Sequence, residues 1–397
     1  MDIVATTSGL SAEKMIAAAC ADAGLNDFGD IDPREGLAHY LADVDKYVVL
    51  NEAGRTGLPA NIHRWLVNGL RFVDDLKKHP DILDEQVDDP LIILGLPRVG
   101  STKMQRLIAA DSDTLSIKFW ETLNPSRMPN MVEGEEDPRI GIARQVLNAM
   151  TENGVGLMQS HLMQLEFAEE DIYLQLPTFR TVGHCFVLPT PDYYDWVSAQ
   201  SMHGTYLYHK RMLQYLQWQK GGRQGPNGAK PWILKTPPHL GHMDSLVHLF
   251  PNAKYVFLHR DIHEVMASTC RLMEMLYRMQ TDVVDMNALG SDMLRIWSAE
   301  MKRHLEQLDA LGSSIDLLDV QYERFRKDAF GVVADIYQLM GRDLTPQREQ
   351  AMREWDANDS HGSFGSYKYS LEQYGLTPAA VDAAFAEYKR RYFPQMT

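Results

Sequence analysis

Cysteine is scarce in this chain, with three residues among 397, at Cys20, Cys185 and Cys270. They lie far apart, and none has the close spacing of a metal-binding pair. The sequence therefore predicts neither a disulfide framework nor a zinc site, and no metal is expected. Buried or free thiols are the simpler interpretation.

Long apolar runs are also missing. No stretch of about 18 consecutive apolar residues indicates a membrane span. The first nine residues, Met1 to Gly9, contain no basic segment leading into an apolar one, so no signal peptide is expected. We therefore expect a cytoplasmic protein without a membrane span, and the sequence leaves a homo-oligomer open.

Positive charge is in deficit, because 39 lysines and arginines face 54 aspartates and glutamates, for a net charge of −15. This balance argues against a general nucleic-acid-binding surface, so any anion site has to be built locally. The composition, 45% hydrophobic and 23% charged, is typical of a globular protein. The length suits one large α/β domain with a helical accessory, or two smaller domains.

The apolar pattern changes along the chain. From Ser11 to about Lys78 apolar residues recur at helical spacing, and a polar stretch from His79 to Pro90 follows. We expect a helical N-terminal extension over residues 1–88 and an α/β domain over residues 89–397.

Short apolar runs alternate with helical patterns in the second part. This alternation predicts parallel β-α-β units and a doubly wound parallel sheet. A loop is expected over residues 124–138, and helical spacing resumes from Ile140 to about Phe167. The expected strands are Leu91–Leu94, Trp232–Leu234, Lys254–Leu258 and Ile315–Leu318.

The first strand runs into a glycine-containing turn and then a helix. Gly95 and Gly100 let the backbone curl, and Ser101 and Thr102 open a helix whose N-terminus favours an anion. The turn nearly spells a nucleoside triphosphatase P-loop, but Ser101 stands where that loop has lysine. The nearest cation before Gly100 is Arg98. An ordinary strand-turn-helix corner is the alternative interpretation.

Two further segments carry polar residues at predicted strand ends. Arg260 follows the strand at Lys254–Leu258, and Ser268 comes about two helical turns later, so both can meet at the sheet edge where ligands of such folds bind. The simpler interpretation pairs Arg260 with Asp261 or Glu264. Another predicted strand leads into Lys235 and then His239.

Together these segments resemble the PAPS-dependent sulfotransferases, PAPS being 3′-phosphoadenosine 5′-phosphosulfate. Pro-Arg-Val-Gly-Ser-Thr resembles their phosphosulfate loop, and Arg260 with Ser268 resembles their 3′-phosphate segment. Leu-Lys-Thr-Pro-Pro-His-Leu is similar to the histidine strand of a bacterial branch of the family. The resemblance implies a doubly wound α/β fold with a P-loop-like phosphosulfate loop. It also implies transfer of a sulfonyl group to a hydroxyl of a small lipophilic acceptor, with 3′-phosphoadenosine 5′-phosphate (PAP) as product.

The resemblance implies a role for each matching residue. His239 would be the catalytic base, Lys235 would stabilise charge on the leaving phosphate, and Arg98 would hold the phosphosulfate. The sequence departs from the family at Ile262 and Glu264, which replace its usual Pro and Asp, and at Ser360 and His361, which replace its basic pair in a C-terminal glycine loop. The implied cofactor contacts are Arg98, Val99, Gly100, Ser101, Thr102, Lys103, Arg260, Ser268, Ser360, His361, Gly362 and Lys368.

Two other functions stay open at this point. A P-loop kinase would need a lysine at position 101, and a sulfotransferase-fold lyase, dehydratase or PAP-binding module would not release a sulfated product. The acidic residues Glu166, Glu169, Glu170 and Asp171 are expected to form a solvated helix face. Residues that could line an apolar acceptor pocket are Phe119, Trp120, Glu121, Met128, Met131, Met158, Met163, Phe179, Phe186, Tyr193, Tyr194 and Trp196.

Overall fold

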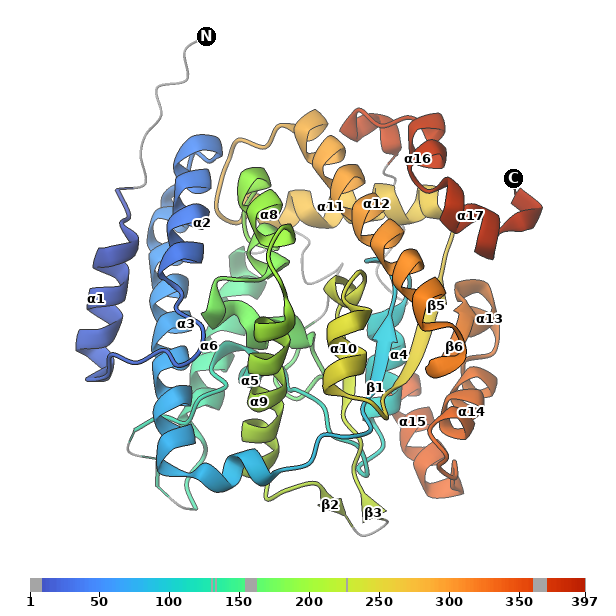
Figure 1. The fold of residues 1–397 in the computed structure, drawn as a ribbon, viewed down its shortest axis with the longest axis horizontal. Helices are drawn as coiled ribbons and strands as arrows, with labels where there is room; N and C mark the ends of the chain where they lie inside the picture. Colours follow the sequence, from blue (N-terminus) through green and yellow to red (C-terminus); the bar gives the residue numbers. More distant parts are fainter. Residues whose placement is uncertain are drawn as a thin grey trace.

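The computed structural model describes residues 9–129, 131–132, 134–153, 163–225, 228–359 and 370–396 (Figure 1). The α-helices described up to residue 219 are α1 (Ala12–Ala23), α2 (Arg34–Tyr47), α3 (Glu52–Lys78), α4 (Ser101–Ala109), α5 (Phe119–Leu123), α6 (Pro138–Asn153), α8 (Pro191–Ser198) and α9 (His203–Gln219). Those that follow are α10 (Met243–Leu249), α11 (Ile262–Arg278), α12 (Met286–Leu311), α13 (Tyr322–Lys327), α14 (Ala329–Leu339), α15 (Pro346–Asn358), α16 (Pro378–Ala384) and α17 (Ala386–Tyr392).

A parallel sheet lies at the centre of the described chain. Its strands β1 (Leu91–Leu94), β4 (Ile233–Lys235), β5 (Lys254–His259) and β6 (Asp316–Gln321) run in the order β4-β1-β5-β6. Every strand pair is parallel, with Ile92 opposite both Leu234 and Tyr255. The inner strand β1 is buried along its length because it is apolar throughout. The predicted parallel sheet is therefore confirmed.

The N-terminal helices pack beside the α/β part rather than apart from it. Helices α1 to α3 lie along one side of the molecule (Figure 1), where α3 packs against α9 and the 3-10 helix η2 (Asp171–Thr178), and α2 packs against α8. Leu37, Tyr40 and Leu66 are fully buried and belong to the same apolar core as the sheet residues. The division at residue 88 stays a prediction of the sequence.

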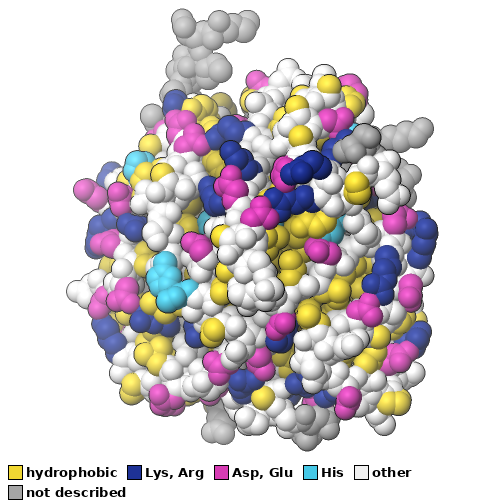
Figure 2. Space-filling model, turned by 45° about the vertical axis from the view of Figure 1, so that its right-hand side comes forward, with side chains coloured by type: hydrophobic (Ala, Val, Ile, Leu, Met, Phe, Trp, Pro, Cys, Tyr) yellow, Lys and Arg dark blue, Asp and Glu magenta, His cyan; other side chains and the backbone are white. Residues whose placement is uncertain are grey.

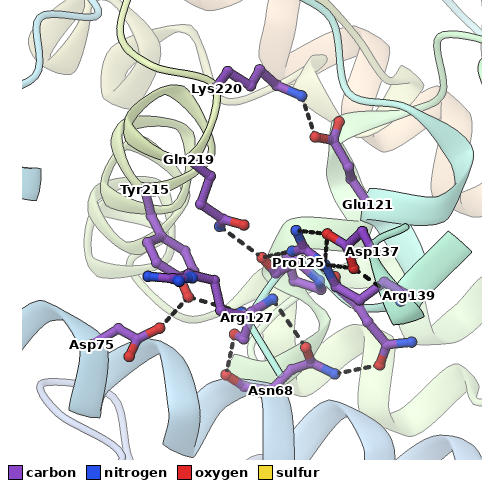
Figure 3. A network of polar contacts seen from close by, with 12 residues as sticks. Asn68, Asp75, Glu121, Pro125, Arg127, Asp137, Arg139, Tyr215, Gln219 and Lys220 are labelled. Atoms are coloured by element: carbon purple, nitrogen blue, oxygen red, sulfur yellow. Dashed lines mark hydrogen bonds and ion pairs between the residues drawn. The ribbon is translucent and has the colours of Figure 1, made fainter. Parts of the chain in front are cut away.

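The predicted loop over residues 124–138 is held in place by polar contacts with α3 and α9 (Figure 3). Asn68 of α3 donates to Asn124 at 3.0 Å and accepts from the backbone N–H of Ser126 at 3.1 Å. The hydroxyl of Tyr215 on α9 accepts from the backbone N–H of Arg127 at 2.9 Å. Two of these three contacts use backbone N–H groups of the loop, which therefore bond to α3 and α9 and not within a helix.

The predicted helix from Ile140 to Phe167 is too long. Helix α6 ends at Asn153, and residues 163–170 are not helical. Instead, the backbone N–H of Glu169 donates to the carbonyl of Ile117 at 2.9 Å, and Ala168 forms a β-bridge with Lys118. Pairing with another segment overrides the local helical spacing here.

Charged side chains of both signs are interspersed over the face shown in Figure 2. None of the helices described is long and apolar enough to cross a membrane.

Candidate active site

Strands β1, β4 and β5 end at one edge of the sheet, where the predicted anion loop begins. The loop after β1 contains three residues with positive φ: Gly95 at 149°, Arg98 at 67° and Gly100 at 93°. Helix α4 starts immediately after it at Ser101. The positive end of the helix dipole and the first free N–H groups therefore face the loop.

At positions 95 and 100, glycine is required by the lack of space for a side chain as well as by the positive φ of the backbone. A Cβ on Gly100 would lie 2.9 Å from the ring of Tyr322, and a Cβ on Gly95 would lie 2.8 Å from a methyl of Val99. Arg98 adopts the left-handed region although it has a side chain, a conformation that is uncommon outside glycine. The loop is therefore a tight turn with a cation at its centre and a helix N-terminus behind it, an arrangement suited to be an anion cradle.

The structure brings the predicted residues of two different loops together. Arg98 Nε donates to the Ser268 hydroxyl at 3.0 Å, and Arg260 Nη1 donates to the carbonyl of Arg98 at 2.8 Å. Arg260 also forms the simpler ion pair with Glu264, at 2.8 Å. One guanidinium thus serves both contacts, since its donors point in several directions.

Tyr322 belongs to this site although the motifs did not include it. Arg260 lies over its ring, with 4.4 Å between the guanidinium carbon and the ring centroid. Tyr322 opens α13 directly after β6, so it stands at the carboxyl end of the fourth strand. That position on the sheet is the signal that could have identified it.

Lys235 ends β4 and points at a carboxylate. Its Nζ lies 2.7 Å from Glu170 Oε1 and donates to the Thr102 hydroxyl at 3.2 Å. Thr236 donates to the other oxygen of Glu170 at 3.0 Å. The Lys235 side chain is 1% exposed and that of Glu170 is 21% exposed, so the carboxylate is the more accessible partner.

A cavity of about 140 Å³ opens beside this pair. Arg98, Ser101, Thr102 and Glu170 form its polar end. The other walls are apolar, and a stacked pair, Phe186 and Trp297, forms part of them with ring centroids 5.9 Å apart. The remaining lining residues are Pro97, Met150, Met163, Tyr173, Pro237, Thr269, Leu272, Met273 and Leu276.

Of the residues predicted for the acceptor pocket, Phe186 and Met163 line this cavity. Tyr193 and Tyr194 are instead buried on α8, where they contact other parts of the core. Met158 lies outside the described residues. The remaining members of that group that are described lie elsewhere in the fold.

His239, the predicted base, does not line the cavity. Its side chain is fully buried in the 3-10 helix η4 (Pro237–His239). Nδ1 lies 3.0 Å from the Tyr206 hydroxyl, and Nε2 lies 2.7 Å from Asp171 Oδ2. The proton acceptor that faces the cavity next to Lys235 is Glu170.

The other predicted cofactor contacts fall into two groups. Val99 is fully buried, and Lys103 extends toward α15, where it pairs with Asp356 at 2.8 Å. The rest lie outside the described residues: Ser360, His361, Gly362 and Lys368.

The predicted solvated acidic face is wrong for three consecutive residues. Glu169 is buried against Arg106, Glu170 pairs with Lys235, and Asp171 is buried between two imidazoles. Burial alone would raise the pKa of Asp171. The contacts and charges of His239 and His209 outweigh that effect and hold the pKa well below its usual range.

Residues 90–346 match a family model described as the sulfotransferase family. Among curated proteins, the omega-hydroxy-beta-dihydromenaquinone-9 sulfotransferase Stf3 of Mycobacterium bovis is 24% identical over 310 residues. That match covers 77% of this chain and 75% of Stf3.

Solved structures agree over nearly the whole chain. Sulfotransferase STF9 from Mycobacterium avium has a TM-score of 0.83 at 26% identity, covering 99% of this chain and 98% of STF9. Sulfotransferase STF1 from Mycobacterium tuberculosis has a TM-score of 0.79 at 27% identity, covering 96% of this chain and 100% of STF1.

Proposed function

Because the chain belongs to the sulfotransferase family, we propose that it transfers a sulfonyl group from PAPS to a hydroxyl of a small lipophilic acceptor. One observation carries the proposal. The Lys235–Glu170 pair stands where the anion cradle meets an apolar cavity. An anionic sulfonyl donor held in the cradle and an apolar acceptor held in the cavity can therefore meet at this pair.

The residues of the cradle suit a nucleotide with two anionic ends. Arg98 and the N-terminus of α4 would hold the 5′ end, and Arg260 with Ser268 would hold the 3′-phosphate. Tyr322 fixes the Arg260 guanidinium from one face. When bound, PAPS supplies the activated sulfonyl group. These cations are local features of a chain whose net charge is −15.

We assign proton removal from the acceptor hydroxyl to Glu170. A general base has to reach the proton that it removes, and Glu170 faces the cavity while His239 does not. Lys235 holds the carboxylate at 2.7 Å and can also stabilise negative charge on the leaving phosphate. The assignment of His239 as base rests on the sequence resemblance alone.

The apolar walls favour a lipophilic acceptor. Residues Thr269, Leu272, Met273 and Leu276 are spaced three, four and seven apart on α11, so one helix face forms a continuous wall. Phe186 and Trp297 add aromatic surface. The name of Stf3 describes a hydroxylated menaquinone as its acceptor, and we propose an acceptor of that general kind, an alcohol or phenol on an apolar body.

Two measurements test the function. PAP should raise the melting temperature more than ATP at equal concentration, because a ligand that binds only the folded state stabilises it, and ATP lacks a 3′-phosphate. Incubation with PAPS and hydroxyl compounds should add one sulfo group to a product detected by mass spectrometry. Equal thermal shifts would argue against the nucleotide site. A product that has lost the hydroxyl of the acceptor and carries no sulfo group would indicate an eliminating enzyme instead.

A further inference from the structure

A buried cluster lies directly behind the Lys235–Glu170 pair. Asp171 Oδ2 is 2.7 Å from His239 Nε2 and 3.0 Å from His209 Nε2. The side chains of all three residues are 0% exposed. None of them lines the cavity. They can therefore affect the reaction only through other residues.

Asp171 links the two residues of the pair through the backbone. It directly follows Glu170, and its Oδ1 accepts from the backbone N–H of Lys235 at 2.9 Å. One carboxylate thus fixes the start of η2, which Glu170 directly precedes, to the end of β4, which carries Lys235. The side chains of the pair itself and of Thr236 add further links between the two segments. Gln105 also bridges them, because its amide donates to the carbonyls of Glu169 and Ile233.

The imidazoles fix Asp171 in turn. His209 is on α9, three residues after Tyr206, and the Tyr206 hydroxyl lies 3.0 Å from Nδ1 of His239. Helix α9 therefore holds the carboxylate directly through His209 and indirectly through Tyr206 and His239. A buried carboxylate requires such partners, because burial of an unpaired charge is costly.

We propose that Asp171, His239 and His209 are positioning residues that hold Glu170 in line with Lys235 and the acceptor hydroxyl. The assignment rests on the proposed function, and it gives His239 a role that fits the burial of its side chain. The proposal has a specific consequence. A misplaced base removes the acceptor proton less well, while the anion cradle, built from β1, α4 and β5, stays in place.

The test compares two substitutions of His239 in the full chain. His239→Leu removes the contact with Asp171, whereas His239→Gln retains an N–H donor at a similar reach. We expect His239→Leu to lower kcat about 10-fold to 100-fold, the scale of a small misplacement of a reacting group. PAP affinity should stay within about twofold, and His239→Gln should recover most of the rate.

The choice of acceptor separates positioning from a general loss of folding. Rates are expressed per PAP-binding site, measured by titration, so unfolded protein does not count. The loss should be larger with an alkyl alcohol than with an acidic phenol, because the alcohol depends more on the base. If His239→Leu does not fold, Asp171→Asn, which has the same shape, should show the same difference between acceptors.

Three results would overturn the proposal. Rates per site within about threefold of wild type, or equal losses with both acceptors, would show that the cluster does not position the base. A loss as large as that of Glu170→Gln that His239→Gln does not recover would show that His239 itself acts as the base. A wild-type enzyme that binds PAP but sulfates no acceptor would instead overturn the proposed function, and this assignment with it.

Discussion

Glu170 lines the apolar cavity, and Lys235 holds it by an ion pair of 2.7 Å. The pair joins positions 65 residues apart in the chain. In the proposed reaction the two residues have different roles: Glu170 takes up the proton of the acceptor, and Lys235 stabilises negative charge on the leaving phosphate.

Glu170→Gln should lower the rate of sulfo transfer by about two to four orders of magnitude, the usual contribution of a positioned general base. PAP should bind as tightly as to the wild type, or more tightly, because a carboxylate near an anion site has been removed. Single-turnover rates with excess enzyme and PAP titration measure the two effects separately. A rate within a few fold of wild type would exclude Glu170 as the base.

Arg260→Ala should remove most of the preference for PAP over adenosine 5′-monophosphate, which lacks only the 3′-phosphate. A hydrogen bond to a charged group is worth roughly 1.5–3 kcal/mol, so the ratio of the two dissociation constants should fall by at least about tenfold. Arg324→Ala serves as the control, because Arg324 is an exposed arginine that pairs with Asp335. An unchanged ratio in Arg260→Ala would place the 3′-phosphate elsewhere.

Among the structural elements, the loop between β1 and α4 has little tolerance for change. Gly100 has φ 93°, and an added Cβ would lie 2.9 Å from the Tyr322 ring, which itself holds Arg260. A change in this loop therefore reaches the 3′-phosphate residues as well. The loop couples both ends of the proposed nucleotide site.

Gly100→Ala should lower the free energy of unfolding by about 1–3 kcal/mol, the cost of a strained backbone position, and should weaken PAP binding. Gly57→Ala is the matched control. Gly57 lies within α3, and a Cβ there would meet no atom within 4 Å. That substitution should raise stability by about 0.4–1 kcal/mol. Urea unfolding measures the change in the free energy of unfolding for both variants. An equal change in both would mean that the Gly100 backbone is not constrained.

The same elements show what the sequence could predict. The strands, the glycine loop and the Arg260–Ser268 segment were recognisable because each depends on residues that are neighbours in sequence. Glu170 was missed because residues 163–170 are fixed by long-range pairing, as in the bond from Glu169 to Ile117, and not by local periodicity. His239 matched a motif, yet its burial depends on α9, which no local pattern specifies.

At the scale of the whole molecule, several histidines are buried in neutral form. Burial lowers the pKa of His184, His242 and His304 to about 3. Arg303 and His239 add to the effect at His242, and His259 adds to it at His304. In the unfolded chain each pKa returns to about 6.5. The unfolded state therefore binds protons between pH 6.5 and 3 that the folded state does not.

The free energy of unfolding should consequently keep its full value above pH 6.5 and decrease as the pH falls below that value. Each of the three histidines contributes a slope of about 1.4 kcal/mol per pH unit, and together they give about 4 kcal/mol per unit. The buried carboxyls whose pKa is lowered, Asp171 and Glu274, add to the loss only at lower pH, near their unfolded pKa of about 4. Burial raises the pKa of Asp43 and Glu300, so these two groups offset part of the loss. Urea unfolding at half-unit steps from pH 8 to pH 5 should show a plateau followed by this decline.

His304→Leu isolates one contributor to that slope. Both ring nitrogens of His304 are buried without a hydrogen-bond partner in the part of the chain described, and the ring packs edge-on against Phe257 at 4.8 Å. Replacing it with an apolar side chain of similar size removes a buried polar group that has no compensating bond, so stability at pH 7 should not fall by more than about 1 kcal/mol. Below pH 6.5, the slope that these three histidines give to the free energy of unfolding should fall by about one third, since one of the three is gone. A slope equal to that of the wild type would mean that His304 is already protonated in the folded protein.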